Sequence, residues 1–402
     1  MITRDLASEL KRSAAVWPCI TLSGPRQSGK TTLCRALFPD HSYANLEAPD
    51  IQVIANEDPR AFLAQFREGA ILDEVQRAPA LIGFLRGIID EDCAPGRWIL
   101  TASQSLELVD SANQSLAGLS AHHKLLPLSY GETKRFSTYP ETIDKVLYSG
   151  SYPRIYDQQL DPADWFSSYV GNYIERDVRL VTNVEDLRKF QRFLRLCAGR
   201  TAQSLNLSGL AWDCGISQPT ANAWLGILEA HYIVFRLPAY RYTTRRRLAK
   251  LPKLHFYDTG LACWLMGIRT PDQLLSHWFR WRIFETWMVS EIAKHRVNAG
   301  TTDGLYHYLA RGAQSGLAIQ DTFGTRLLDA KTSEMPLSEM WRGVERAQKQ
   351  VIKSGDRCSA TVVYGGDKAP YPDSDCFLQW QNLQGVDWCA AVPQHTDVKG
   401  FV

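Results

Sequence analysis

A glycine-rich loop, "GPRQSGKTT" at residues 24–32, follows the apolar run "WPCITLS" and precedes a segment with helical spacing. The loop fits the pattern G-x-x-x-x-G-K-[ST] through Gly24, Gly29, Lys30 and Thr31. Because such a loop must lie between a strand and a helix, it constrains the chain to an α/β fold. Its backbone N–H groups and the helix N-terminus surround a phosphate. We therefore expect one stretch to bind the phosphates of ATP or ADP: Gly24, Pro25, Arg26, Gln27, Ser28, Gly29, Lys30, Thr31 and Thr32.

Short apolar runs alternate with helical patterns from Pro18 to Leu128. The strand candidates are "CITLSG", "HSYANLE", "GAILDEV" and "GRWILTAS", each separated from the next by polar or helical stretches. Alternation of this kind predicts a parallel sheet flanked by helices.

The run "AILDEVQ" supplies the second half of the expected site. Asp73 would stand at the C-terminal end of its strand, where open parallel sheets bind ligands, and would hold Mg²⁺ together with Thr31. Glu74, one position further, can orient and deprotonate a water for attack on the γ-phosphate. The alternative is that the two carboxylates merely end a strand in solvent.

The next apolar run, "WILTASQS", ends in the polar residues Thr101, Ser103 and Gln104. Either Ser103 or Gln104 would contact the γ-phosphate or the attacking water, and the residues themselves leave that choice open. In the alternative they only begin the turn after the strand.

Further motifs follow in order, among them "YANLEAPDIQVIANEDPRAFL", "LLPLSYGE", "GSYPRIY", "LPKLHFYDTGLACWLMGI" and "FETWMVSEI". With the loop and "ILDEVQRAPALI" they resemble a widespread family of prokaryotic AAA+ ATPases. Members carry a C-terminal domain of unknown function that is similar to restriction-endonuclease-like nucleases. The resemblance implies an AAA+-like P-loop NTPase core over residues 1–136, with ATP and Mg²⁺ as cofactors.

One residue departs from that family pattern. Members usually read Ser-Leu-Ala-Gly-Arg where this chain has Leu119, and an arginine there would sense the charge of the γ-phosphate. Its absence predicts slow hydrolysis, with Arg26 and Arg154 as possible substitutes. Because a ring also needs an arginine presented to its neighbour, we expect a monomer or dimer.

Residues 137–200 carry helical spacing and would form a lid over the nucleotide. Within this lid, the charged triplet Glu175, Arg176 and Asp177 would brace lid against core or contact the nucleotide.

Residues 201–275 fit a winged helix-turn-helix. The helix "LSGLAWDC", a turn at Gly215, the helix "QPTANAWLGILEA" and a β-rich pair follow one another. Side chains near the start of the second helix would meet base edges, and cations on the wing would meet phosphates of double-stranded DNA. The alternative is a structural or regulatory contact with protein. The candidate DNA contacts are Gln218, Thr220, Asn222, Arg245, Arg246, Arg247 and Lys250.

Residues 276–402 read as helix, three strands, helix, strand, the order of a restriction-endonuclease-like core. An amphipathic helix carries Glu285, and "DAK" supplies Asp329 and Lys331. The family's central Glu-Val-Asp is replaced by residues 314–316, "QSG", and Asp321 is expected beyond a turn. Hard cations require anionic oxygens, so we expect no nuclease activity and a buried ion-pair cluster of Glu285, Asp329 and Lys331.

Composition limits the remaining possibilities. A net charge of +2 over 402 residues leaves any basic surface local, and the nine cysteines contain no C-x-x-C pair. The scattered thiols and the lack of a long apolar run predict a cytoplasmic protein away from membranes. The expected function is a Mg-dependent ATPase that switches a winged-helix and nuclease-like module. The alternative is a nucleotide-gated DNA- or protein-binding regulator with little hydrolysis. A third function, an ATP-regulated metal-dependent nuclease, is disfavoured by Gly316.

Overall fold

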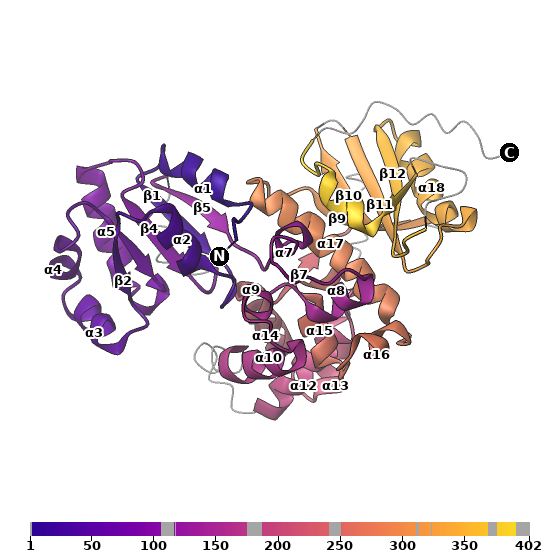
Figure 1. Ribbon diagram of the computed structural model, residues 1–402, viewed down its shortest axis with the longest axis horizontal. Helices are drawn as coiled ribbons and strands as arrows, with labels where there is room; N and C mark the ends of the chain where they lie inside the picture. The colour runs from indigo at the N-terminus through magenta and orange to yellow at the C-terminus, as the bar shows by residue number, and fades with distance from the viewer. Residues whose placement is uncertain are drawn as a thin grey trace.

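The computed structural model describes residues 2–105, 116, 118–174, 187–240, 251–310, 313–322, 324–368 and 376–390. Figure 1 shows an N-terminal sheet with its helices (indigo to purple), a mostly helical middle (magenta to orange) and a C-terminal sheet (orange to yellow). None of the helices in these ranges has both the length and the apolar character that crossing a bilayer requires.

The N-terminal sheet is parallel and five-stranded, in the order β2-β3-β4-β1-β5. This order puts β1 between β4 and β5, so the loop that follows β1 opens at the middle of the sheet. The four strands expected from apolar runs are present, which confirms an α/β core with a parallel sheet. The fifth strand, "SAHHK", was not expected because its two histidines interrupt any apolar run. The strands are β1 (Cys19–Ser23), β2 (Ser42–Asn45), β3 (Ala70–Asp73), β4 (Trp98–Ala102) and β5 (Ser120–Lys124).

Helices cover both faces of this sheet, each through its own hydrophobic cluster. On one face Leu6 and Leu10, before and within α1, and Leu33 of α2 pack on Ile20 and Ile99. The other face is closed by side chains of α3, α4 and α5, such as Phe62 and Leu85. The helices are α1 (Ala7–Ala14), α2 (Lys30–Leu37), α3 (Pro49–Glu57), α4 (Pro59–Ala64) and α5 (Ala80–Glu91), with a 3₁₀ turn η1 (Val75–Arg77).

The middle of the chain is helical with one small antiparallel sheet of order β6-β8-β7. Gly215 ends α13 in the left-handed region at φ 65°, and Ser217 caps α14 by accepting from the N–H of Thr220. The elements are α7 (Tyr130–Thr133), α8 (Ile143–Ser149), α9 (Pro153–Asp157), α10 (Pro162–Tyr169), a π turn η3 (Val170–Ile174), α12 (Leu187–Ala198), β6 (Gln203–Ser204), α13 (Leu207–Cys214), α14 (Gln218–Ala230), β7 (Val234–Leu237), β8 (Lys253–Phe256), α15 (Thr259–Leu265) and α16 (Pro271–Leu275).

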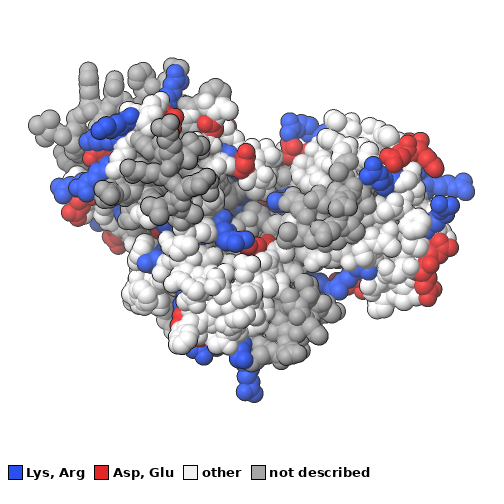
Figure 2. All heavy atoms as spheres, turned by 180° about the vertical axis from the view of Figure 1, so that it is seen from behind, with Lys and Arg blue, Asp and Glu red and all other residues white. Residues whose placement is uncertain are grey.

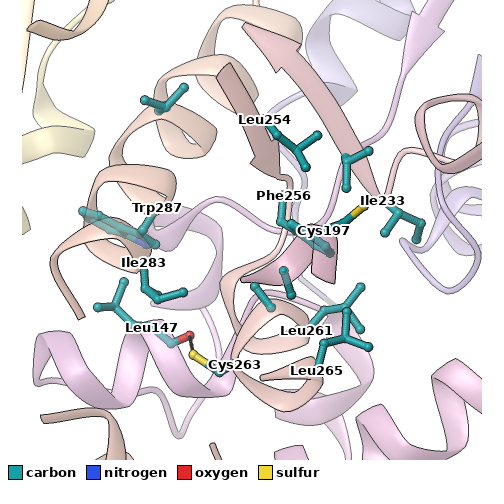
Figure 3. Packing of buried hydrophobic residues seen from close by; sticks show 14 of the residues in the cluster. Leu147, Cys197, Ile233, Leu254, Phe256, Leu261, Cys263, Leu265, Ile283 and Trp287 are labelled. Atoms are coloured by element: carbon teal, nitrogen blue, oxygen red, sulfur yellow. Dashed lines mark hydrogen bonds between the residues drawn. The ribbon is translucent and has the colours of Figure 1, made fainter. Parts of the chain in front are cut away.

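One hydrophobic cluster joins these elements to the long helix α17 (Arg280–Asn298). Figure 3 shows Leu147 of α8, Phe256 of β8, Leu261 of α15 and Ile283 of α17 in this cluster. Side chains from residues 137–200 and 201–275 therefore share a core. All nine cysteines lie within the described residues and are free thiols.

The C-terminal sheet has the order β13-β12-β11-β10-β9, with β9, β10 and β11 antiparallel and β12 and β13 parallel to β11. The expected order of elements along the chain, which is a helix, three strands, a helix and a strand, is the order observed. Strand β13 and the segment η4 follow these elements and were not predicted. The elements after α17 are β9 (Leu305–Ala310), β10 (Ala313–Asp321), β11 (Gly324–Lys331), α18 (Ser338–Lys353), β12 (Cys358–Tyr364), β13 (Phe377–Gln379) and a 3₁₀ segment η4 (Trp380–Gly385).

Two expectations for this part are wrong. Helix α17 is not amphipathic, because it lies between β8, β11, α15 and η4 and is buried on all sides over residues 283–294, including at Glu285, Glu291 and Lys294. Asp321 does not lie beyond a turn but is the last residue of β10, where its Oδ1 accepts from the N–H of Gly324 at 3.0 Å.

Candidate nucleotide-binding site

The loop between β1 and α2 closes tightly on itself. A Cβ at Gly24 would lie 2.2 Å from the backbone oxygen of Leu125, so no larger residue fits there. Gly29, just before α2, has φ 95°, and Gln27 has φ 62°, a conformation that costs a non-glycine residue free energy. These positions turn the chain sharply between a buried strand and a helix N-terminus, as a phosphate-binding loop requires.

Lys30 points into this loop. Its Nζ donates to the backbone oxygens of Gly24 and Pro25, both at 3.0 Å, and the Oγ of Ser28 is buried without a hydrogen-bond partner in the described residues. Burial lowers the pKa of Lys30, against the opposing effect of Glu74 and Asp73. A buried ammonium and an unsatisfied hydroxyl around a loop of backbone N–H groups fit a bound phosphate.

Asp73 lies at the end of β3, where three hydroxyl groups meet it. Thr31 Oγ1 and Tyr43 OH each donate to Oδ2 at 2.8 Å, and Thr101 Oγ1 donates to Oδ1. A carboxylate beside a threonine hydroxyl is the oxygen donor set that Mg²⁺ prefers. Thr31 and Asp73, which were expected to share a metal, are therefore in direct contact.

Glu74 is held in an unusual conformation, with φ 61° and ψ 46°. Its N–H donates to Thr101 Oγ1 at 3.1 Å, while its Oε2 accepts from Ser103 Oγ at 2.6 Å and from Gln76 Nε2. Burial alone would raise the pKa of Glu74, but Lys30, the hydrogen bond from Ser103, Arg26 and Gln76 lower it overall. Glu74 is thus an ionised, oriented carboxylate. Strained residues of this kind gather at functional sites.

Ser103 and Gln104, between which the sequence left the choice open, differ in their surroundings. Ser103 is buried and contacts Glu74, whereas Gln104 is half-buried, and neither is among the described residues that line the cavity. Gln76, which the sequence did not single out, completes the contact by donating to Ser103 Oγ at 3.0 Å.

Arg4 stabilises the glycine-rich loop by a hydrogen bond to its backbone, and the sequence did not predict this role. Its Nη1 donates to Ser28 O at 2.7 Å, its Nη2 to Leu126 O at 2.8 Å, and its Nε to Glu132 Oε1 at 2.9 Å. Glu132 also caps α7 through the N–H of Ser129. Since Arg4 lies 24 positions before Ser28 and 128 before Glu132, no local pattern signals the contact.

A cavity of about 570 Å³ opens over the loop. Arg154, at the start of α9, is exposed in its wall and donates from Nε to Gln158 Oε1 at 3.0 Å. Arg26 lines it too and pairs with Glu47 at 3.1 Å. Leu119 instead packs against the core of the sheet. The lining comprises Ile2, Arg4, Arg26, Gln27, Gly29, Lys30, Thr31, Thr32, Leu33, Asn45, Glu47, Asp73, Glu74, Leu128, Phe136, Pro153, Arg154, Asp157 and Gln158.

The candidate DNA contacts lie far from this cavity in the sequence and are only partly described. Gln218 and Asn222 are exposed in the first turns of α14, and Thr220 is half-buried. Arg245, Arg246, Arg247 and Lys250 lie outside the described residues, as does the triplet Glu175, Arg176 and Asp177. On the face drawn in Figure 2, the coloured lysines and arginines stand in separate small groups with acidic residues among them.

The expected ion-pair cluster in the C-terminal part divides into two pairs. Glu285 Oε1 lies 2.5 Å from Lys253 Nζ, and Asp329 Oδ2 lies 2.8 Å from Lys331 Nζ. Lys253 comes from β8 and was not expected. Burial raises the pKa of Glu285, against Lys253, and Asp329 adds to the rise. A Cβ at Gly316 would be 3.2 Å from Glu285 Oε1, so a side chain at this position would stand beside Glu285.

Comparison with known families assigns the first part of the chain. Residues 17–134 match the family model described as an AAA domain. This part of the chain is an AAA domain. It contains the loop, Asp73 and Glu74. Residues 140–272, which follow the AAA domain, match a domain of unknown function (DUF8612).

Two curated relatives carry no assigned activity. They are the uncharacterized proteins Rv2008c of Mycobacterium tuberculosis and Mb2031c of Mycobacterium bovis, each 30% identical over 268 residues, or 66% of this chain. The match covers 60% of the length of each relative.

Two solved structures are similar at lower levels. The Walker-type ATPase PABY2304 of Pyrococcus abyssi is 16% identical, with 66% of this chain and 96% of that chain covered and a TM-score of 0.43. AMPPCP-bound DnaA from Aquifex aeolicus is 14% identical, with 56% and 85% covered and a TM-score of 0.29.

Proposed function

We propose that this protein is a Mg-dependent ATP hydrolase with slow turnover. The observation that carries the proposal is the position of Glu74, which is ionised and held by Ser103 and Gln76 beside Lys30 and Asp73. A general base must be charged and oriented before its water arrives, and these contacts supply both conditions.

Each residue of the candidate site has a definite role in this proposal. Lys30 and the N–H groups of the loop bind the phosphates, and Thr31 and Asp73 would hold Mg²⁺. Magnesium bound there neutralises charge on the phosphates. Glu74 orients a water molecule and accepts its proton at a carboxylate oxygen, and Ser103 keeps that carboxylate in place. Arg154 is the candidate cation for the γ-phosphate, because Leu119 offers no charge.

Slow turnover keeps the protein in its ATP-bound form for long periods, as a conformational switch requires. Two hydrogen bonds support the middle of the chain as the part that responds to the bound nucleotide. Ser23, next to the loop, shares a hydrogen bond of 2.7 Å with Tyr232 OH. Ser105, beyond β4, donates from its N–H to Ala230 O at 2.8 Å. Both partners lie at the end of α14, so a change in the loop would reach the proposed winged helix directly.

We also propose that the chain is divided into four domains, which are residues 1–136, 137–200, 201–275 and 276–402.

The experiment is phosphate release by the full chain and by Glu74→Gln. Loss of a general base lowers kcat by about 10²- to 10⁴-fold, while ATP affinity is retained. Lys30→Ala should lose ATP binding instead, and Glu57→Gln, an exposed glutamate on α3, should change neither. Equal turnover in wild type and Glu74→Gln would refute hydrolysis at this site.

A second candidate function is nucleotide-gated binding of double-stranded DNA. Exposed Gln218 and Asn222 at the start of α14 favour it, since such helices present these positions to base edges. Reversal of the four charges at Arg245, Arg246, Arg247 and Lys250 should weaken binding and flatten its salt dependence. Unchanged affinity, with Gln218→Ala also silent, would favour a protein partner for this surface.

Cleavage of DNA by the C-terminal part is not part of this proposal. Gly316 stands where a carboxylate would be needed, and Lys253 already neutralises Glu285. Mg-dependent cutting that disappears in Asp329→Ala would overturn this view. We further propose a monomer or dimer, which mass measurement in solution with and without ATP can test.

A further inference from the structure

Three metal-ligating side chains meet at the C-terminal end of α17, away from the nucleotide site. His295 lies in the last turn of that helix, and Asp387 and Cys389 lie in the segment after η4. One ligand atom from each lies within 4.8 Å of the other two. Nitrogen, oxygen and sulfur donors from distant parts of the chain are thus gathered in one place.

His295 is ready to act as a ligand. Its Nδ1 is buried and has no hydrogen-bond partner among the described residues. A buried ring nitrogen without a partner is costly, which calls for a reason. A metal bound at this nitrogen would supply the missing partner.

The segment that carries the other two ligands is held independently. Arg296 Nη1 donates to Trp388 O at 2.7 Å, and Arg326 Nη1 donates to Asp387 O at 3.1 Å. Asp387 Oδ1 also accepts from the N–H of Cys389 at 2.8 Å, so the turn is closed by the carboxylate itself. These contacts position Asp387 and Cys389 before any metal binds, and they leave Oδ2 of Asp387 as the oxygen for coordination.

We propose that His295, Asp387 and Cys389 form a zinc site with a fourth position for water. Imidazole, carboxylate and thiolate are the donors that Zn²⁺ uses, whereas Mg²⁺ and Ca²⁺ take oxygen ligands. The carboxylate and the thiolate together cancel the charge of the ion, which matters beside Arg296 and Arg326. Binding transfers the thiol proton of Cys389 to solvent and forms a Zn–S bond.

The geometry requires a small adjustment. Ligands about 2.0–2.3 Å from a tetrahedral zinc are about 3.3–3.8 Å apart, so atoms that lie within 4.8 Å of one another need to approach by no more than about 1.5 Å. Asp387 is exposed and Cys389 is half-buried, so neither side chain is fully enclosed by the protein.

Such an ion would fix the segment after η4 to helix α17. One turn before His295, Glu291 Oε2 accepts from the N–H of Tyr130 at 2.7 Å, and Lys294, next to His295, donates from Nζ to Leu128 O at 2.9 Å. These two hydrogen bonds attach α17 to the end of the AAA domain. Zinc at His295 would therefore hold the segment after η4 to the same helix that contacts the AAA domain.

The test uses Co²⁺ as a spectroscopic substitute for Zn²⁺ in nucleotide-free full-length protein stripped with a chelator. We expect one equivalent of Co²⁺ to produce a thiolate-to-metal charge-transfer band that Zn²⁺ abolishes. Cys389→Ser should lose this band entirely, and His295→Gln should weaken Zn²⁺ affinity by at least about tenfold. Cys93→Ser, which removes an exposed thiol elsewhere, is the matched control.

Thermal unfolding gives a second readout. Zinc that binds only the folded chain should raise the Tm of wild type and of Cys93→Ser, but not that of Cys389→Ser. ATP turnover without zinc should be equal in all variants, which shows that they fold. Absence of the band in wild type, or its survival in Cys389→Ser, would overturn the proposal and leave the hydrolase proposal untouched.

Discussion

Ser103 donates a hydrogen bond of 2.6 Å from its Oγ to Oε2 of Glu74, and thereby joins the ends of two neighbouring strands, β3 and β4. The bond lowers the pKa of the carboxyl that we propose as the general base. In Ser103→Ala we expect that pKa to rise. Activity requires the ionised form, so the acidic limb of the kcat–pH profile should move upward by about one pH unit. An unshifted profile, identical to that of the exposed-site control Ser8→Ala, would contradict this role.

Tyr43 competes with a metal for Asp73, because its OH donates to the same Oδ2 that accepts from Thr31. Tyr43→Phe removes the competitor. A hydrogen bond is worth about 0.5–1.5 kcal/mol, so half-maximal ATPase activity should need about 2- to 10-fold less Mg²⁺. Titration of activity with Mg²⁺ measures this. Tyr148→Phe, which loses a bond to Arg269 O far from the site, should leave the titration unchanged.

Arg4 should matter for stability more than any surface ion pair. Arg4→Ala leaves the buried carboxylate of Glu132 without its cationic partner, which typically costs about 3–5 kcal/mol of unfolding free energy. Arg135, which pairs with half-exposed Asp5, is the matched control, and Arg135→Ala should cost no more than about 1 kcal/mol. Denaturant unfolding compares the two. Equal losses would mean that Arg4 does not hold the loop and α7 together.

The Arg4–Glu132 pair also predicts a pH dependence. Burial would raise the pKa of Glu132, but the charge and hydrogen bond of Arg4, with the N–H groups of Asp5 and Ser129, lower it below its usual 4.5. A depressed pKa contributes stability above pH 4.5, and that contribution is lost as the pH falls through the folded-state value. The unfolding free energy of wild type should therefore be higher than that of Glu132→Gln, and this difference should be largest at neutral pH.

The comparison should be made at pH 7 and again at acidic pH, where the advantage of wild type should shrink. Glu141→Gln, at an exposed carboxyl, supplies the control and should show no such pH-dependent difference. A gap between wild type and Glu132→Gln that stays constant across this range would show that the charge of Glu132 is not responsible.

Much of the nucleotide site was predictable because it is local in the sequence. The glycine pattern around Lys30 and the carboxylates after a strand are read within a few residues, and both lie where a parallel sheet requires them. The helix 218–230 was predicted at its observed bounds, since the turn at Gly215 and the sequence of the helix itself are also local. Strand β5 was missed because "SAHHK" has a polar pattern and is held by pairing with β1.

Apart from the bond between Gln76 and Glu74, the contacts that were missed join residues that are distant along the chain. Arg4 with Ser28, Tyr43 with Asp73, and Lys253 with Glu285 depend on packing between separate elements. These contacts form because a charged or hydroxyl group that is buried in the protein must have a hydrogen-bond partner, and the fold determines which partner is within reach.

The amino-acid sequence alone specified that this chain contains a glycine-rich loop of the phosphate-binding type, an aspartate at the end of a strand and a glutamate next to it, since loop geometry and strand ends follow from neighbouring residues. Only the tertiary structure decided that Ser103 and Gln76 hold Glu74, that Arg154 faces the cavity, and that His295 meets Cys389. The physical reason is that close approach between distant segments depends on how the hydrophobic clusters pack, which no short stretch of sequence encodes.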